Sequence, residues 1–382
     1  MTEIVLRIKH NDTCIDIEFP IEESPLYAKL AELHATDHEG DPFFVEKVLE
    51  PVELKDFFEG KSVDLDEINY LAKRMESFSG QEYYQFLAAS RFEDHLTPRD
   101  LVNLTFNLQR YTLIRDMTNL QKVGVTHLLN KGELLTTDET KSPRMAEVGK
   151  ELICSGKGLA SEFGLLFINE DIEYEAVYNG KTFPEYQYRP CIATVYLEHG
   201  DQTECLYLPE AYRAITKAIK RLGCDSINEC TVSMEITDLR EETLSNLLHD
   251  ILESEGLYKA NLVAKEMDNC DDPRNLAAAI SYAGVNDADS VITVAQSLDV
   301  FVFAKNIYDD YELGEYWIDK VDEYTYSPEL QDYIDFEEYG KDVCRDKNGE
   351  YVDNYGFVGL DCDMRLSDIL DCNEQGMGEM SL

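Results

Sequence analysis

The chain has 382 residues, of which 77 are Asp or Glu and 34 are Lys or Arg, giving a formal net charge of −43. Hydrophobic residues make up 44% of the sequence and aromatic residues 10%, which excludes a disordered acidic tail, since such tails lack the residues needed to bury a core. The charge also disfavours binding to nucleic acid or to an anionic membrane, and it favours a basic protein partner.

The N-terminal segment is predicted to form a β-hairpin. Residues 1–19 lack the basic flank and apolar stretch of a signal peptide, and no run of 18 apolar residues predicts a transmembrane helix. They read instead as a strand, a turn at Asn11-Asp12 and a second strand. The ten cysteines form no CxxC pair, so we expect reduced, mostly buried thiols in a cytoplasmic protein.

The first half is predicted to continue from this hairpin into a helix over 26–34 and then into a helical segment. Asp64 is expected to cap a helix that runs to Gly80, because apolar residues recur there at helical spacing. A short helix is predicted over 81–89, and another begins after Thr97, with a proline in its first turn.

The second half is predicted to open in a similar way. A hairpin over 195–208 is followed by a helix over 212–222. Thr237 or Asp238 is then expected to cap a helix over 239–253. These elements follow the order that is predicted for the first half.

The remainder of the second half is strongly acidic. Asp272-Pro273 is expected to begin a helix, 301–303 to form a strand, and 311–321 to form a helix with Leu313 and Trp317 on one side. Residues 306–382 contain 22 acidic and 5 basic residues. Like charges at helical spacing destabilise an isolated helix, so packing must stabilise these segments.

The chain resembles itself at an offset of about 185–192 residues. A nearly constant offset across several stretches predicts two tandem copies, at about 1–185 and 186–382. The first copy holds 35 acidic and 19 basic residues, and the second holds 42 acidic and 15 basic residues. The corresponding stretches are 6–17 and 195–208, 101–104 and 291–294, 108 and 298, 123–124 and 313–314, 142–143 and 327–328, 149–152 and 340–343, 158 and 349, and 164–165 and 356–357.

Each copy is expected to have three parts, which predicts an α+β fold. The first part is a small β-hairpin and helix unit, the second is helical, and the third mixes short strands with helices that are acidic in the second copy. The predicted boundaries are 1–62, 63–102 and 103–185 in the first copy, 186–237, 238–285 and 286–362 in the second copy, and 363–382 for a flexible tail.

Two sets of residues resemble a known family. The run 64–72, followed by 100–105, resembles the central helical part of the ArdA antirestriction proteins. In the second copy, 313–318 together with 333–342 resembles the C-terminal part of that family and is the more specific of the two. These stretches cover both copies only in patches.

The resemblance implies an elongated, acidic, three-part protein that is carried by mobile genetic elements, mimics bent B-form DNA and has no enzymatic activity or cofactor. ArdA proteins occupy the DNA-binding groove of type I restriction-modification enzymes. Family members usually hold one three-part unit and dimerise through its C-terminal part. Because this chain is expected to hold two units, its oligomeric state stays open: it could be a monomer by tandem fusion or a homodimer. Few carboxylates occur over 147–167, so the share of the first copy in mimicry also stays open.

The expected mechanism is competitive occlusion by an acidic ridge of the second copy. The alternative for each residue is an ordinary solvated helix face. No catalytic residue and no metal ligand is assigned. The candidate partner-binding residues are Asp309, Asp310, Glu312, Glu315, Asp319, Asp322, Glu323, Asp332, Asp335, Glu337, Glu338 and Asp342.

Two other functions remain possible from the sequence: a calcium-binding acidic protein and an acidic adaptor for another basic DNA-binding protein. The run 346–350 resembles a calcium loop, but its glycine is at the fourth place instead of the sixth, so a turn between short strands is favoured. Gly60-Lys61-Ser62 lacks the first glycine of a phosphate loop. The pair His34 and His38 is typical of an exposed helix end rather than a metal site.

Overall fold

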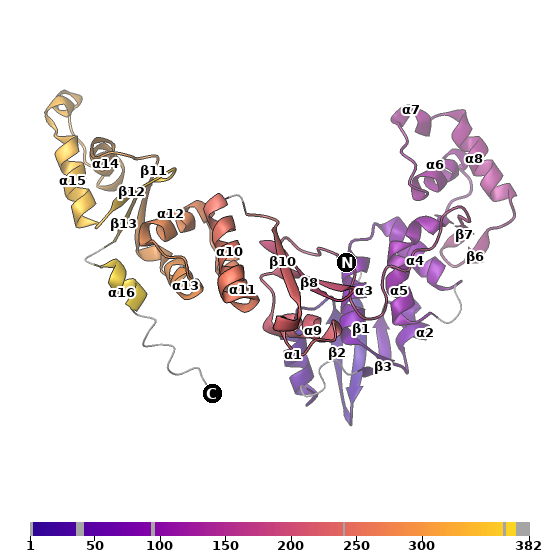
Figure 1. The fold of residues 1–382 in the computed structure, drawn as a ribbon. Helices are drawn as coiled ribbons and strands as arrows, with labels where there is room; N and C mark the ends of the chain where they lie inside the picture. Colours follow the sequence, from indigo (N-terminus) through magenta and orange to yellow (C-terminus); the bar gives the residue numbers. More distant parts are fainter. Residues whose placement is uncertain (1–2, 36–41, 93–95, 240, 362–363, 372–382) are drawn as a thin grey trace. The chain divides into compact units, whose positions relative to one another are not determined.

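The computed structural model describes residues 3–35, 42–92, 96–239, 241–361 and 364–371. The protein is α+β, with helices and small antiparallel sheets in succession along the chain (Figure 1). Two compact units are present. Unit 1 comprises Met1–Tyr188, His199–Glu204 and Arg213–Glu229, and unit 2 comprises Arg189–Glu198, Cys205–Tyr212 and Cys230–Leu382. In the described part of the chain, every helix is too short or too polar to cross a membrane.

Unit 1 begins with a four-stranded sheet in the order β2-β1-β3-β4. The predicted first hairpin is present, and Asn11 adopts a positive φ of 52° in its turn. Alternate residues of the first strand, Ile4, Leu6 and Ile8, are fully buried, as expected for a strand with one face on a core. The elements are β1 (Ile4–His10), β2 (Thr13–Phe19), α1 (Glu23–Glu32), β3 (Phe43–Glu50) and β4 (Ser62–Val63).

A helical layer follows in unit 1, and two of its caps, at Asp64 and Thr97, are those that the sequence predicts. The first helix ends at Glu76 rather than at Gly80, because Ser79 caps a second helix that begins at Gly80. The Asp64 side chain accepts a hydrogen bond from the Asp66 amide, and Thr97 forms a capping box with Asp100. Burial of Leu71 and Leu101 ties these helices to the core of the first sheet. The helices are α2 (Lys55–Phe58), α3 (Leu65–Glu76), α4 (Gly80–Ser90) and α5 (Pro98–Phe106).

The rest of unit 1 is a three-stranded sheet in the order β5-β7-β6, with two helices packed together beside it. Residues 169–188 follow β7 in the chain without regular helix or strand, and two asparagines at the end of α5 bond to their backbone. Asn103 donates to the Tyr178 carbonyl (2.9 Å) and accepts from the Tyr178 amide (2.8 Å), and Asn107 holds the backbone of Glu175 in the same way. The elements are β5 (Tyr111–Ile114), α6 (Leu120–Asn130), α7 (Thr137–Thr140), α8 (Pro143–Cys154), β6 (Leu159–Ser161) and β7 (Gly164–Ile168).

The second half again begins with a sheet and a helix. β8 (Ala193–His199), β9 (Gln202–Leu208) and β10 (Thr231–Ile236) form a sheet in the order β10-β8-β9, and α9 spans Tyr212–Arg221. The boundary between the two units passes through this hairpin. The predicted hairpin and helix are therefore both present.

One predicted helix start is wrong. The helix expected to be capped by Thr237 or Asp238 begins at Glu242, and no side chain caps it. The amides of Thr237 and Asp238 instead donate to the Ile192 carbonyl, so this backbone extends the sheet beyond β10. The hydrogen bonds to Ile192, which is distant in the sequence, hold Thr237 and Asp238 in the sheet and prevent either residue from capping the helix.

The helical and third parts of unit 2 follow the predictions more closely. Asp272 caps the helix that begins at Pro273, and the strand expected at 301–303 is present. The predicted helix over 311–321 changes at Trp317 into a wider, π-helical turn through Val321. The elements are α10 (Glu242–Glu255), α11 (Leu257–Asp268), α12 (Pro273–Ala283), α13 (Ala288–Gln296), β11 (Phe301–Lys305), α14 (Asp310–Tyr316), α15 (Phe336–Asp346), β12 (Glu350–Val352), β13 (Gly356–Leu360) and α16 (Leu366–Asp371).

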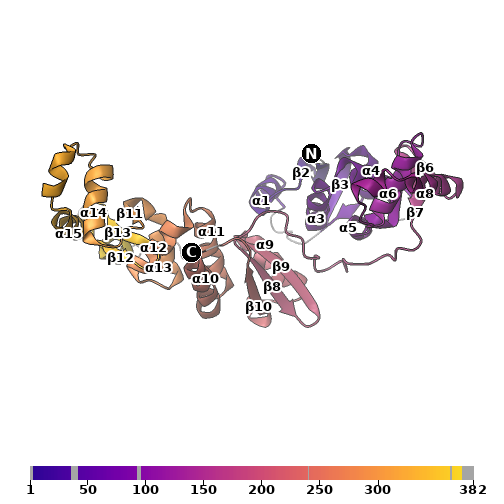
Figure 2. The ribbon, with the colours of Figure 1, turned by 90° about the horizontal axis from the view of Figure 1, so that it is seen from above.

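The third parts of the two halves share a sheet order and a close helix pair. The sheet orders are β5-β7-β6 and β11-β13-β12. Figures 1 and 2 show α6 beside α8 and α14 beside α15. A methyl group on Gly124 would lie 1.9 Å from the Met145 carbonyl oxygen, and one on Gly314 would lie 1.9 Å from the Phe336 carbonyl oxygen. Both helix pairs therefore require glycine where their backbones touch.

The two halves also share an asparagine contact between their first sheet and their helices. Asn69 of α3 accepts from the Ile21 amide and donates to the Ile21 carbonyl, at 2.8 Å each. Asn261 of α11 makes the same two bonds to Glu210, at 2.7 and 2.8 Å. In both halves an asparagine of the helical part thus fixes the backbone just after the second strand of the sheet.

The cysteines do not match the expectation of mostly buried thiols. Among the described cysteines, only Cys191 and Cys224 are buried. Cys14 is exposed on β2, and Cys154 is exposed at the last residue of α8. Composition alone did not indicate that these positions lie on outward faces.

Replacing Gly314 by Ala should destabilise the third part of unit 2 by about 1–3 kcal/mol, because the added methyl group forces the two backbones apart. Trp317 is the single tryptophan of the chain and lies in the adjoining core, so its fluorescence reports thermal unfolding of this region. The control is Gly80→Ala, where an added methyl group meets no atom within 4 Å. Equal melting curves for the two variants would contradict the prediction.

Candidate functional site

The candidate carboxylates lie on a segment of unit 2 that we call the acidic region, residues 309–342. It runs through α14, the π-helical turn, a short 3-10 helix (Pro328–Tyr333) and most of α15. Asp310, Glu315 and Asp342 are half-buried, and the other candidates are exposed. Helix α14 contacts α15 through the glycine pair Gly314 and Gly340, which places the two helices side by side.

Some of these carboxylates serve the local backbone. Asp309 caps α14 by accepting from the Glu312 amide (2.9 Å), and Asp335 caps α15 by accepting from the Glu338 amide (3.1 Å). The Glu312 carboxylate accepts from the amide of Tyr308 (3.0 Å). These groups start the helices of the acidic region, so their removal would disturb structure as well as charge.

Other carboxylates form ion pairs at the surface. Lys341 lies 2.7 Å from Glu337 and 3.9 Å from Glu338, and Arg345 lies 2.6 Å from Asp342. All five side chains are at least 46% exposed. Such pairs contribute roughly 0–1 kcal/mol, so a basic partner can displace them.

Three candidates accept hydrogen bonds from tyrosine hydroxyls: Asp310, Asp319 and Asp322. By contrast, the side chains of Glu315, Glu323 and Asp332 form no hydrogen bond or ion pair with the described residues. The acidic region therefore offers a mixture of fixed and unengaged carboxylates.

Aromatic residues separate into core and surface groups. Trp317 is 6% exposed and packs edge to face on Phe357, with Tyr316 partly buried beside it. Tyr333 is 86% exposed, so it lies outside this core. Tyr324 is 60% exposed. The acidic region thus presents phenol groups among its carboxylates.

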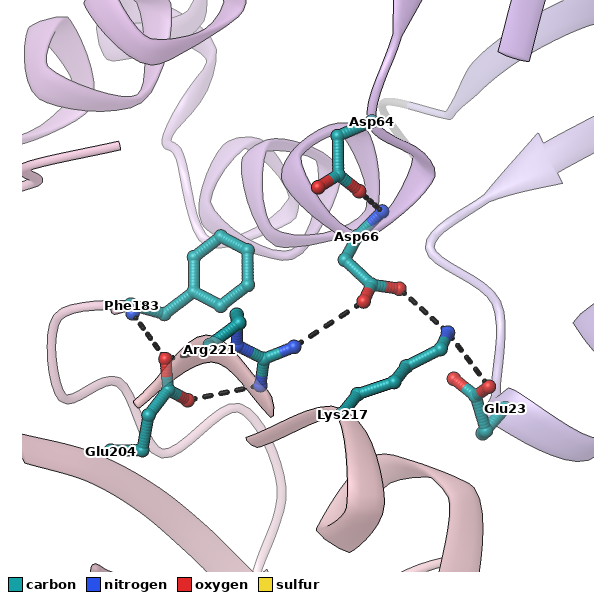
Figure 3. Close-up of polar contacts among 7 residues, drawn as sticks. All are labelled: Glu23, Asp64, Asp66, Phe183, Glu204, Lys217 and Arg221. Atoms are coloured by element: carbon teal, nitrogen blue, oxygen red, sulfur yellow. Dashed lines mark hydrogen bonds and ion pairs between the residues drawn. The ribbon is translucent and has the colours of Figure 1, made fainter. Parts of the chain in front are cut away.

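Unit 1 contains a different acidic cluster, in which the carboxylates are paired with two cations (Figure 3). Glu204 of β9 is 1% exposed and accepts two hydrogen bonds from Arg221 at 2.9 Å each. The Phe183 amide also donates to Glu204 (2.9 Å). Arg221 reaches Asp66 as well, at 3.3 Å.

Lys217, one turn before Arg221 on α9, completes this network. Its ammonium lies 2.8 Å from Glu23 and 2.9 Å from Asp66. Burial opposes the charge of both cations, but their carboxylate neighbours outweigh it and raise the pKa of Arg221 and the pKa of Lys217. The cluster consists of satisfied, partly buried ion pairs, which identifies it as structural rather than as a partner-binding surface.

The weaker sequence motifs do not form sites. No group of His, Cys, Asp or Glu suited to a metal ion occurs among the residues that the structure describes. His34 has a φ of 54° just after α1, and its proposed partner His38 lies outside the described residues. Gly60 forms a turn (φ 77°) before β4 rather than the entry to a helix.

The calcium-like run 346–350 is a turn, but its expected setting was wrong in one respect. It joins α15 to β12, so a helix rather than a strand precedes it. Gly349 packs on the ring of Phe357, and a methyl group there would lie 2.2 Å from that ring. Close packing against the core explains the glycine without a metal ion.

With this arrangement in place, the comparisons with known proteins can be assessed. Residues 201–358 match the family model of the antirestriction protein ArdA. The match covers less than half of the chain but contains the whole acidic region. Comparisons with curated proteins and with solved structures gave no significant match.

The ArdA match supports an antirestriction function and a restriction-modification partner in general terms. It begins in the turn between β8 and β9 and ends within β13. The resemblance that the sequence indicated for the second half is thereby confirmed for this ArdA-like region. The first half lies outside the match.

Sequence reasoning missed two groups of residues that bond to carboxylates, one in the acidic region and one in the cluster of unit 1. The three hydroxyl donors, Tyr326, Tyr339 and Tyr351, are 7, 17 and 41 residues away from their acceptors. No spacing rule links such residues. Lys217 and Arg221, in contrast, are four apart on one helix face, which was a usable signal in a chain so poor in cations.

Replacing Glu204 by Gln should destabilise unit 1 by about 3 kcal/mol, because Arg221 then remains buried without its main counter-ion. Thermal unfolding followed by circular dichroism measures this loss. The matched control is Asp201→Asn in the exposed turn of the same hairpin, which should change stability by less than about 0.5 kcal/mol. A Glu204 variant as stable as the control would show that the network contributes nothing.

Proposed function

We propose that this protein is an antirestriction protein that imitates the phosphate outline of duplex DNA. In this proposal its acidic region occludes the DNA-binding groove of a type I restriction-modification enzyme or a related host-defence enzyme. The observation that carries the proposal is that exposed carboxylates of 309–342 lie inside the region matching ArdA. No chemical step is required of the protein.

The physical basis is a match of charge spacing. Duplex DNA carries one negative charge per roughly 1.7 Å of helix axis. Carboxylates three or four residues apart on a helix lie roughly 5–6 Å apart at Cβ, which is a coarse match to the phosphates of one strand at about 3.4 Å of axis each. A groove lined by Lys and Arg would therefore attract the acidic region over long range and then hold it in place of DNA.

We further propose that the chain consists of two tandem ArdA-like copies, each built from the three parts described above. Three observations support this: the common sheet orders, the two glycine-dependent helix pairs, and the hydrogen bonds of Asn69 and Asn261 to the backbone after the second strand of each sheet. In the first copy, α8 carries Arg144 and Lys150, with only Glu147 and Glu151 as its acidic residues. The first copy then acts mainly as scaffold.

The deciding experiment is a competition. Purified full-length protein is added to a type I methyltransferase core bound to labelled duplex DNA, and release of the DNA is followed. Displacement with one protein per binding groove supports the proposal. Failure to displace DNA at a large excess of protein contradicts it.

Reversing four exposed carboxylates should abolish this competition, whereas any one reversal should change it little, because attraction is spread over many charges. The test variant carries Glu323→Lys, Asp332→Lys, Glu337→Lys and Glu338→Lys. The matched control reverses Glu133, Asp138, Glu147 and Glu151, which are exposed residues of the first half. An equal loss in both variants would indicate that net charge, not the acidic region, governs binding.

Ionic strength should control the rate at which the inhibitor associates. Exposed charges are screened over about 8–10 Å at 0.1–0.15 M salt, so the association rate constant should fall steeply as salt rises through this range. Stopped-flow measurements of association with the methyltransferase core give this slope. A rate that does not depend on salt would rule out electrostatic steering.

A further inference from the structure

Three tyrosine hydroxyls donate hydrogen bonds to carboxylates of the acidic region. The distances are 2.8 Å from Tyr326 to Asp319, 2.6 Å from Tyr339 to Asp322 and 2.8 Å from Tyr351 to Asp310. Each bond joins two different elements or a loop and an element, so none of them is a local turn contact. Together they fix side chains on both α14 and the π-helical turn.

The rings that carry two of these hydroxyls are anchored in the core. Tyr339 and Tyr351 pack against the cluster that contains Trp317 and Phe357, and the Tyr351 ring lies 5.8 Å from the Phe357 ring. A phenol has only two side-chain torsions, so an anchored ring holds its hydroxyl in one place. The carboxylate that accepts from it is then held in one orientation as well.

The hydrogen bonds persist at neutral pH and leave the carboxylates able to accept more. The bond to Asp322 raises the pKa of Tyr339 to about 12, and the bond to Asp319 raises the pKa of Tyr326. Both hydroxyls therefore keep their protons. Each tyrosine bonds to one carboxylate oxygen, and the second oxygen has lone pairs for a cation.

The corresponding helix pair of the first half lacks these groups. A methyl group on Gly340 would meet the Asp310 carbonyl, and one on Gly149 would meet the Leu120 carbonyl, so Leu120 takes the place of Asp310. In the sheet of unit 2, Tyr351 pairs with Phe357, the residue after Gly356. In the sheet of the first half, Ala160 pairs with Leu165, the residue after Gly164, so Ala160 takes the place of Tyr351. Val148, which precedes Gly149, takes the place of Tyr339.

The same arrangement of helices and strands thus forms with apolar residues at these positions. Neither the glycine contact nor the sheet order requires a tyrosine–carboxylate pair. Tyrosine–carboxylate hydrogen bonds also occur in unit 1, as from Tyr188 to Glu76, but the first-half positions that match Asp310, Tyr339 and Tyr351 hold apolar residues. The pairs at these three positions are thus specific to the part of the chain that carries the acidic region, which argues for a role in what that region binds.

We infer that Tyr326, Tyr339 and Tyr351 are positioning residues that orient Asp319, Asp322 and Asp310 for Lys and Arg side chains of the partner's groove. This inference rests on the proposed function. A carboxylate oriented beforehand loses less conformational freedom on binding, so the complex dissociates more slowly. The net charge is unchanged by the tyrosines, so the association rate does not depend on them.

The test replaces all three tyrosines by Phe in the full-length protein and measures association and dissociation with the methyltransferase core. We expect dissociation about tenfold faster, which corresponds to about 1.4 kcal/mol, with the association rate and its salt dependence unchanged. The matched control replaces Tyr308, Tyr324 and Tyr333, whose hydroxyls bond to no described residue, and it should behave as the unaltered protein. Trp317 fluorescence and the melting midpoint establish that each variant is folded.

The outcomes separate the inference from the proposed function. If the unaltered protein displaces DNA but both triple variants dissociate at its rate, the positioning role is overturned and the proposed function stands. If the unaltered protein displaces no DNA, the proposed function is overturned and the inference with it. If the triple variant does not fold, the single variant Tyr326→Phe decides, because the ring of Tyr326 lies outside the core cluster. Dissociation of this variant about twofold faster supports the inference, and an unchanged dissociation rate overturns it.

Discussion

Mutual repulsion of carboxylates is the constraint under which this chain folds. With a net charge of −43, any compact arrangement brings like charges together, and only burial of apolar surface and local neutralisation can offset that. The two units meet this constraint in different ways. Unit 1 neutralises carboxylates inside the fold, as Glu204, Asp66 and Glu23 are by Arg221 and Lys217. The acidic region of unit 2 leaves most of its carboxylates at the surface.

The few cations of the chain have different roles in the two units. Lys217 and Arg221 are committed to partly buried pairs in unit 1, whereas Lys341 and Arg345 form exposed pairs in the acidic region. A buried pair is costly to break, and an exposed pair exchanges readily with solvent or with a partner. The acidic region, where the ion pairs are exposed and weak, therefore presents the negative charge that a binding partner meets.

Local signals in the sequence predicted much of the fold. The hairpins, the caps at Asp64, Thr97 and Asp272, and the strand at Phe301 depend on neighbouring residues, and the structure has all of them. The start of α10 was misplaced because Ile192, some 45 residues earlier in the sequence, holds Thr237 in an extended backbone. The candidate carboxylates could be named from acidity alone, but the tyrosines that hold three of them could not, since those contacts exist only after the helices and strands have packed.

The asparagine contacts along 169–188 bear on how the chain can be altered in practice. A stretch without helix or strand between two halves of a chain is the usual place to insert a reporter domain or an affinity tag. Here Asn103 and Asn107 bind the backbone at Tyr178 and Glu175, so an insertion would strip two buried amides of their partners. The tip of the hairpin at Gly200-Asp201, where both residues are exposed, is the safer site for such a graft.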